Sequence, residues 1–312
     1  MLYEHTADPT WQAEAERWTE GLETLKTLRG THDLGFMMHN SFGQGYRLTR
    51  NPAYRNVVLE TSETLAERYN PTVGAIRSWG FGVWEFPVIV DNLMNLEMLY
   101  WAAANGGDAS WADLATNHAQ RSLREHVRPD GTTFHVVDFD TTSGEVRDKH
   151  THQGYADASM WTRGQAWAVY GFTLTFRATQ DSTFLRAAQT VAGTYLAALP
   201  EDHIPYWDFN HPAIPDTTRD ASAAAITASA LFELGGYSAP DDQVRYHDAA
   251  ASMVAALIHR YRTEGTDNPA LLLSSTGNAN RDSEVDVPII YADYYFVEAL
   301  LRYLGITSGT TS

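Results

Sequence analysis

Residues 160–179 read MWTRGQAWAVYGFTLTFRAT, and a helix built from this stretch would be apolar on nearly every side. A helix that is apolar all round is buried. The stretch that follows, 182–199, places Phe184, Val191 and Tyr195 on one stripe and polar residues on the other face. That pattern is typical of a helix that covers a core. The sequence therefore predicts a buried helix followed by a covering helix.

The same alternation extends along most of the chain. Stretches of the buried type are 34–47, 88–104, 160–179, 219–236 and 289–304. Amphipathic stretches are 10–28, 52–69, 109–127, 182–199 and 242–262. An inner ring of buried helices inside an outer ring explains this order, so we expect an all-α fold, a six-pair α/α barrel. Such a barrel would lack about its first one to two helices, because only a helical stub at residues 1–6 precedes the first amphipathic stretch.

Residues 131–150 form the clearest non-helical segment. Apolar and polar residues alternate from Thr133 to Val137, and a Thr-Thr-Ser-Gly turn follows, which predicts a β-hairpin inserted between helices. No linker, low-complexity tract or block of like charges interrupts the sequence. We therefore expect one catalytic domain over residues 1–312.

Composition narrows the function. The chain has no cysteine, so disulfides, thiolate metal sites and cysteine nucleophiles are excluded. The net charge is -17, and no run of Lys and Arg suits nucleic acid. No apolar stretch approaches the ~18 residues of a membrane span. The first residues, MLYEHTADPTW, do not resemble a signal peptide. We expect neither nucleic acid nor membrane as a partner.

Two aspartates are candidates for acid–base chemistry. Asp91 lies in the apolar segment PVIVDNLMNL, where burial would raise its pKa toward that of a general acid. The alternative is that Asp91 caps a helix or ends a buried strand. Asp33 follows His32 at the start of a buried helix, where an N-cap role is the simpler interpretation.

Other candidates suit ligand binding. His135 lies on the predicted hairpin, and His152 follows it in His-Thr-His-Gln-Gly. This His-x-His pattern lacks a third metal ligand at a diagnostic spacing, so hydrogen bonding to a ligand is favoured over a metal site. Arg163 opens a buried helix and needs a partner, either a structural carboxylate or the carboxylate of a substrate. Tryptophans such as Trp79, Trp161 and Trp167 suit stacking on sugars, although most aromatics at helical spacing are core residues.

Taken together, nine motifs in order resemble the unsaturated glucuronyl hydrolases, glycoside hydrolase family 88. They are THDLGF (31–36), IRSW (76–79), PVIVDNLMNL (87–96), FHVV (134–137), THQG (151–154), WTRGQAW (161–167), PYWDF (205–209), RDASAAAI (219–226) and YADYYFVEAL (291–300). The resemblance extends from residue 1 to about residue 304. Nine motifs in register are far more specific than any one of them.

The resemblance implies a glycosidase that releases a terminal 4,5-unsaturated glucuronic acid from oligosaccharides left by polysaccharide lyases. Asp91 matches the general acid/base that hydrates the C4=C5 vinyl ether, and Asp33 matches a second carboxylate that holds sugar hydroxyls. His135, Gln153, Trp161, Arg163 and Trp167 match pocket positions, and we add His152 as a hydrogen-bond donor. Trp79 matches a stacking aromatic. The resemblance implies no metal and no organic cofactor.

Several alternatives stay open from sequence. The family has a helix and a Trp-Thr-x-Gly-Phe segment before the point where this chain begins, and any export signal would lie there. The compartment is therefore open between cytoplasm and periplasm, and the protein is expected as a monomer or homodimer. Rival functions are an unsaturated rhamnogalacturonyl hydrolase and a catalytically inactive uronide-binding barrel. The source polysaccharide, its sulfation and the preferred aglycone are not predicted.

Overall fold

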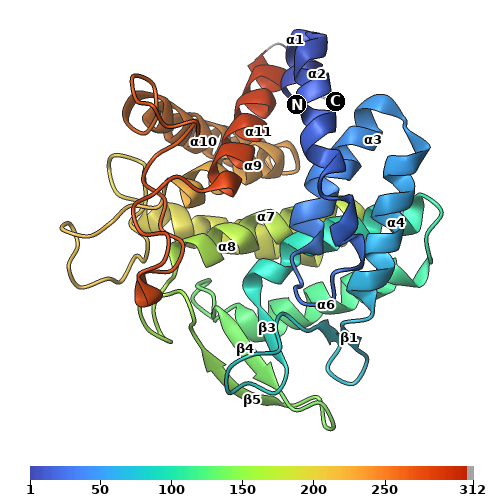
Figure 1. The fold of residues 1–312 in the computed structure, drawn as a ribbon. Coiled ribbons are helices and arrows are strands. Elements are labelled where there is room, and N and C mark those ends of the chain that lie inside the picture. Colours follow the sequence, from blue (N-terminus) through green and yellow to red (C-terminus); the bar gives the residue numbers. More distant parts are fainter. Residues whose placement is uncertain (308–312) are drawn as a thin grey trace. The chain divides into compact units, whose positions relative to one another are not determined.

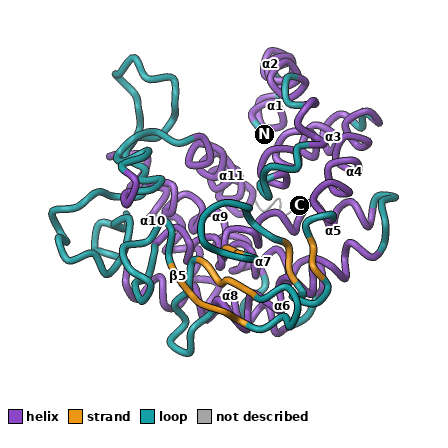
Figure 2. Tube along the Cα trace, turned by 60° about the horizontal axis from the view of Figure 1, so that its bottom comes forward, coloured by secondary structure: helices purple, strands orange, loops and turns teal. Residues whose placement is uncertain are grey.

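The computed structural model describes residues 1–307, and helices form most of them (Figure 1, Figure 2). The contacts divide the chain into two compact units. The first unit comprises residues 1–124 and 137–148, and the second comprises residues 125–136 and 149 onward. Within residues 1–307, no helix combines the length and the apolar character that crossing a bilayer would require. The expectation of one domain stays a prediction.

The first unit contains the hairpin and the early helices. Its elements are α1 (Leu2–Thr6), α2 (Pro9–Glu20), η1 (Glu23–Thr27), η2 (Gly35–Gly43), α3 (Gln44–Thr49), α4 (Pro52–Ala66), β1 (Tyr69–Asn70), β2 (Ala75–Ile76), β3 (Pro87–Ile89), η3 (Val90–Asn95), α5 (Leu96–Ala104) and most of α6 (Ser110–His126), β4 (Val136–Phe139) and β5 (Val146–His150). The buried segments η2 and α5 pack against each other and against α4. Helix α4 begins at an Asn51 cap followed by Pro52, a favoured helix start.

The second unit shows the predicted alternation of buried and covering helices. Its elements are α7 (Thr162–Thr179), α8 (Ser182–Ala198), α9 (Ala221–Gly236), α10 (Pro240–Arg260), η4 (Ala279–Arg281) and α11 (Ile290–Thr307). Helix α9 packs against α7 and α11 and is covered by α10, while α8 covers α7. Helices α7 and α9 are buried on nearly all sides, whereas α8 and α10 bury one stripe.

Three helices of the second unit begin at the same end. Arg163 is the second residue of α7, and its guanidinium bonds Asp220, the N-cap of α9. The same guanidinium lies 5.5 Å from the ring of Tyr291, in the first turn of α11. The N-termini of α7, α9 and α11 therefore meet around one arginine.

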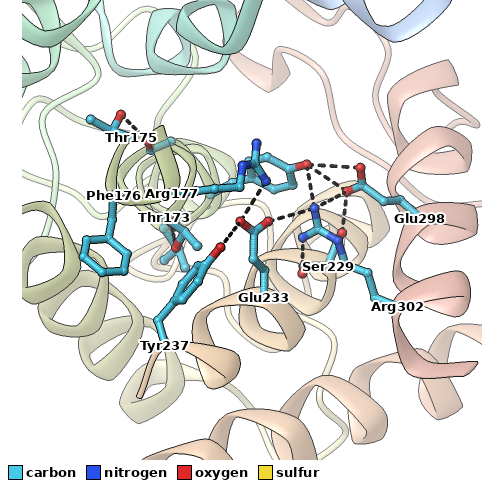
Figure 3. Close-up of polar contacts among 12 residues, drawn as sticks. Thr173, Thr175, Phe176, Arg177, Ser229, Glu233, Tyr237, Glu298 and Arg302 are labelled. Atoms are coloured by element: carbon cyan, nitrogen blue, oxygen red, sulfur yellow. Dashed lines mark hydrogen bonds and ion pairs between the residues drawn. The ribbon is translucent and has the colours of Figure 1, made fainter. Parts of the chain in front are cut away.

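A polar network joins the same three helices nearer their C-terminal ends (Figure 3). Glu233 of α9 accepts from Arg177 of α7 at 2.7 Å and from Arg302 of α11 at 2.9 Å. Glu298 of α11 accepts from the Tyr170 hydroxyl at 2.9 Å. These charged groups are largely withdrawn from water but are paired, which is the condition for keeping charge inside a helical core.

Three local predictions need correction. Segment 88–104 is not one helix: β3 ends at Ile89, η3 is a 3-10 helix and α5 follows. The β-branched run VIV favours an extended start, and β3 pairs with β4. The apolar stripe predicted for 10–28 is not buried, since Trp11 is 46% and Trp18 68% exposed. The hairpin is confirmed, but its first strand begins at Val136 rather than at Thr133.

Candidate active site

Asp91 lies in the first turn of η3, directly after the buried strand β3. Its side chain is buried, with a residue exposure of 8%, and its neighbours Val90 and Leu93 are fully buried. The predicted setting, a carboxyl group among apolar residues, is confirmed. Strand β3 ends two residues earlier, so Asp91 belongs to the helical turn.

Hydrogen bonds fix the segment that carries Asp91. The Ile89 N–H donates to Ser78 Oγ at 2.9 Å, and Asn92 Nδ2 donates to the Ile76 carbonyl at 2.9 Å. Ser78 and Ile76 belong to the IRSW motif, which ends at Trp79. Two of the sequence motifs are therefore joined side by side within the first unit.

Asp33 does not cap the helix that follows it. The side chain of Asp33 is 43% exposed, and its Oδ1 lies 3.2 Å from His32 Nε2. The N–H groups of Gly35 and Phe36, which an N-cap would satisfy, donate instead to Asn95 Oδ1 at 2.8 and 3.2 Å. The N-cap interpretation of Asp33 is thus wrong, and within residues 1–307 its carboxylate accepts no backbone N–H in this way.

His32 is the buried neighbour of this carboxylate. Burial lowers the pKa of His32, Asp33 opposes that effect and Arg68 adds to it. The imidazole packs edge-on against Trp79, with ring centroids 6.2 Å apart. His32 therefore lies between an aromatic ring and a half-exposed carboxylate, in a setting whose burial favours the neutral imidazole.

The predicted stacking aromatic, Trp79, is itself covered. Its ring is buried and lies parallel to that of Phe81, at 14° and 5.1 Å between centroids, with Trp84 at 5.3 Å. Phe81 is 56% exposed. The aromatic face that reaches solvent in this cluster therefore belongs largely to Phe81, which the sequence analysis did not select.

The remaining candidates gather in the second unit around His135. Its Nδ1 accepts from the backbone N–H groups of His152 and Gln153 at 3.0 and 3.1 Å. An accepting Nδ1 places the proton of the neutral ring on Nε2. The Trp161 ring lies 4.4 Å from His135. The hairpin histidine, the THQG motif and Trp161 are thus in direct contact.

Arg163 has a structural carboxylate as its partner. The residue is 1% exposed, and its Nη1 donates to Asp220 Oδ2 at 2.7 Å and also to the Thr276 carbonyl. Nη2 donates to the Gly277 carbonyl at 2.5 Å. The guanidinium also lies 4.7 Å from the Trp161 ring. A role for Arg163 in substrate binding stays a prediction.

Three further candidates border this cluster. Gln153 Nε2 donates to the Gly277 carbonyl at 3.0 Å, the carbonyl that Arg163 also uses. Burial lowers the pKa of His152, and Arg281 lowers it further. Trp167 is buried with its ring edge-on to Tyr291, at 5.9 Å, so it packs as a core residue beside the arginine.

The structure gives the His-x-His pattern no metal geometry. His150 Nδ1 lies 3.6 Å from Asp157 Oδ2, and Nδ1 of His135 is occupied by backbone donors. Among residues 1–307, no three His, Asp or Glu side chains are grouped as metal ligands.

Sequence reasoning missed three residues of these clusters. Asn95 lies in the same PVIVDNLMNL motif as Asp91, but the sequence does not show that it reaches Gly35, 60 residues away. Asp220 shows a recognisable N-cap signal before an alanine-rich helix, yet nothing local links it to Arg163. Phe81 lies in a glycine-flanked loop, where no periodicity indicates exposure.

The relatives identify the chain as a helical glycoside hydrolase. An unsaturated glucuronyl hydrolase of Formosa agariphila is 45% identical over 309 residues, covering 97% of this chain and 76% of that protein. A solved unsaturated glucuronyl hydrolase specific for heparin is 42% identical with a TM-score of 0.95, covering 98% of this chain and 83% of that chain. No family model matches the chain.

A third relative broadens the family. The unsaturated chondroitin disaccharide hydrolase of Streptococcus pyogenes is 34% identical, covering 97% of this chain and 78% of that protein. The chain belongs to the unsaturated glucuronyl hydrolases. The predicted fold class, the all-α barrel of that family, is confirmed by the structural match.

Proposed function

We propose that this chain hydrates the C4=C5 bond of a terminal unsaturated glucuronate with Asp91 as the general acid and base. The observation that carries the proposal is the placement of Asp91: it is buried in η3, and Asn95 of the same helix bonds the segment that begins just after Asp33. Two carboxylates of one unit, one buried and one half-exposed, suit the two roles that the chemistry requires.

The steps follow from the vinyl ether. Asp91 donates a proton to C4, and positive charge develops at C5 and the ring oxygen. A water molecule adds its oxygen to C5 while the Asp91 carboxylate takes the proton that the water loses, so the acid is regenerated. The product at C5 is a hemiketal, which opens at the bond between C5 and the ring oxygen to give a ketone at C5 and a hemiacetal at C1. That hemiacetal then collapses to an aldehyde and releases the aglycone with a free hydroxyl. Asp33 is proposed to hold sugar hydroxyls during this sequence.

We propose that the cluster around His135 in the second unit binds a sugar of the oligosaccharide by hydrogen bonds. His135 presents an Nε2 proton, and Gln153 and His152 lie beside it on one backbone turn. The natural substrate class is proposed as lyase-generated glycosaminoglycan disaccharides. Support comes from the heparin specificity of one relative and the chondroitin disaccharide activity of another.

The test uses lyase-generated heparin and chondroitin disaccharides and follows the ultraviolet absorbance of the conjugated double bond. We expect wild type to consume one or both, and Asp91→Asn to lower kcat about 10²–10⁴-fold, the usual contribution of a general acid–base group. Lyase-generated rhamnogalacturonan fragments test the rival hydrolase activity in the same absorbance assay. Calorimetry with the disaccharides tests whether the chain binds a uronide without hydrolysing it.

The matched control is Asp138→Asn. Asp138 is also a buried carboxylate of the first unit, but it binds the Phe86 N–H at 2.8 Å rather than lying in η3. We expect it to keep kcat near wild type. If wild type leaves the absorbance unchanged, the proposed function is rejected. If calorimetry then shows binding without turnover, a uronide-binding protein is favoured. Full activity of Asp91→Asn rejects Asp91 as the general acid.

A further inference from the structure

We infer that Asn95 is a positioning residue that caps helix η2, whose own N-cap residue Leu34 has no acceptor, so that the carboxylate of the preceding Asp33 is left to the substrate. The inference rests on the proposed function, because it assigns to Asp33 a role in holding sugar. It concerns how the chain delivers that carboxylate.

The geometry of the cap is specific. Asn95 is fully buried, and its single Oδ1 accepts from both Gly35 N and Phe36 N. These are donors of the first turn of η2, which have no partner inside the helix. Normally an Asp, Asn, Ser or Thr just before the helix would supply the acceptor. The residue just before η2 is Leu34, whose side chain has no acceptor, and Asp33, one residue earlier, has its carboxylate turned to His32.

The amide of Asn95 is itself oriented by a second amide. Asn95 Nδ2 donates to Asn92 Oδ1 at 3.2 Å, and Asn92 Nδ2 donates to the Ile76 carbonyl at 2.9 Å. Both asparagines are fully buried. This order of donors and acceptors leaves Asn95 one orientation, with Oδ1 toward η2. Asn92 follows Asp91 directly, so this series of hydrogen bonds, here called the relay, connects the segments that carry Asp33 and Asp91.

Glycine at position 35 makes the close approach feasible. A Cβ at Gly35 would lie 2.6 Å from Asn95 Cα and 2.8 Å from its Oδ1, closer than real Cβ atoms come. The start of η2 therefore rests directly on the Asn95 backbone. Any larger residue at Gly35 must push η2, and Asp33 with it, away from η3.

The experiment compares Asn95→Ala with Asn51→Ala. Asn51 is a matched control, because it caps α4 of the same unit through Ala53 N at 3.0 Å but lies outside the relay. We expect Asn95→Ala to lower kcat/KM on the unsaturated disaccharide about 10- to 100-fold, the order expected when a catalytic group is displaced by about 1 Å. Asn51→Ala should lower the melting temperature with kcat/KM unchanged.

A double-mutant cycle separates positioning from folding. In an Asp33→Asn background, Asn95→Ala should cause little further loss, because its effect passes through Asp33. An equal loss in both backgrounds overturns the inference. Full kcat/KM in folded Asn95→Ala also overturns it.

Gly35→Ala perturbs the same contact from the other side and decides the matter if Asn95→Ala does not fold. We expect about a tenfold lower kcat/KM in folded Gly35→Ala, again from displacement of Asp33; wild-type kcat/KM overturns the inference. If wild type binds the disaccharide but does not hydrolyse it, the proposed function fails. The double-mutant cycle is then measured as the Kd of the disaccharide by calorimetry. An equal loss of affinity from Asn95→Ala in both backgrounds again overturns the inference.

Discussion

Replacing Asp220 with asparagine tests what the pairing with Arg163 contributes to stability. Both side chains are buried, and Arg163 Nη1 lies 2.7 Å from Asp220 Oδ2. The other oxygen, Oδ1, caps α9 by accepting from Ser222 N at 3.1 Å. Asparagine keeps the shape and, with its oxygen at the Oδ1 position, the cap, but it removes the charge and turns an NH2 donor toward Arg163. Asp220→Asn therefore measures the cost of leaving a buried guanidinium without its counter-ion and with one acceptor fewer.

The magnitude follows from that burial. Removing one partner of a buried ion pair costs about 3–5 kcal/mol. The carbonyls of Thr276 and Gly277 still accept from Arg163, so we expect a value near the lower end, about 3 kcal/mol. Asp220→Ala loses the cap as well and should cost about 1 kcal/mol more.

The assay is urea unfolding of both variants, followed by circular dichroism. Arg163→Met combined with Asp220→Asn should recover part of the lost stability, because no unpaired charge is left buried. A cost below about 1 kcal/mol for Asp220→Asn would refute the reasoning, since a pair removed from water cannot be that cheap to break. Failure of the double variant to recover stability would likewise show that the charge is not the source of the loss.

Two further predictions concern stability. Burial lowers the pKa of His32 below 6.5, so the unfolded chain takes up the imidazole proton at a higher pH than the folded chain does. The free energy of unfolding should therefore be unaffected by this group above about pH 6.5 and should fall as the pH drops below it. His32→Gln should show a smaller fall over the same pH range, and equal falls in both proteins would contradict the prediction. Glu233→Gln should cost about 1–3 kcal/mol, because Arg177 loses its ion pair with Glu233 and Arg302 keeps the more distant carboxylate of Glu298. Glu14→Gln at an exposed pair should cost under about 0.5 kcal/mol. Similar melting temperatures for the two variants would contradict this prediction.

Local periodicity predicted the helices well because their burial follows from their own composition. Segments 160–179 and 219–236 are buried on nearly all sides, as their apolar character indicated. The hairpin turn and the stub at residues 1–6 were also predicted from short-range signals. The 3-10 turn that carries Asp91 was not, because its geometry depends on pairing of β3 with a strand nearly 50 residues later.

The sequence supplied candidate site residues but not the hydrogen bonds and ion pairs that they form. The identity of Asp33 suggested an N-cap, and only the tertiary position of Asn95 shows otherwise. The sequence left the partner of Arg163 open between a structural carboxylate and the carboxylate of a substrate. In the structure Arg163 bonds a structural carboxylate, that of Asp220. Trp79 was chosen for its ring, but its exposure depends on Phe81 in the following loop. Each of these facts is a long-range contact that composition and spacing do not encode.

The shared starting point of α7, α9 and α11 has an electrical consequence. Peptide dipoles give each helix start a partial charge of about +0.5, and here three of them add within one small region. Amide groups neither gain nor lose protons over the pH range in which proteins stay folded. An acidic chain with a net charge of -17 thus carries, where these three helices begin, partial positive charges that do not titrate and that lie beside the Arg163–Asp220 pair.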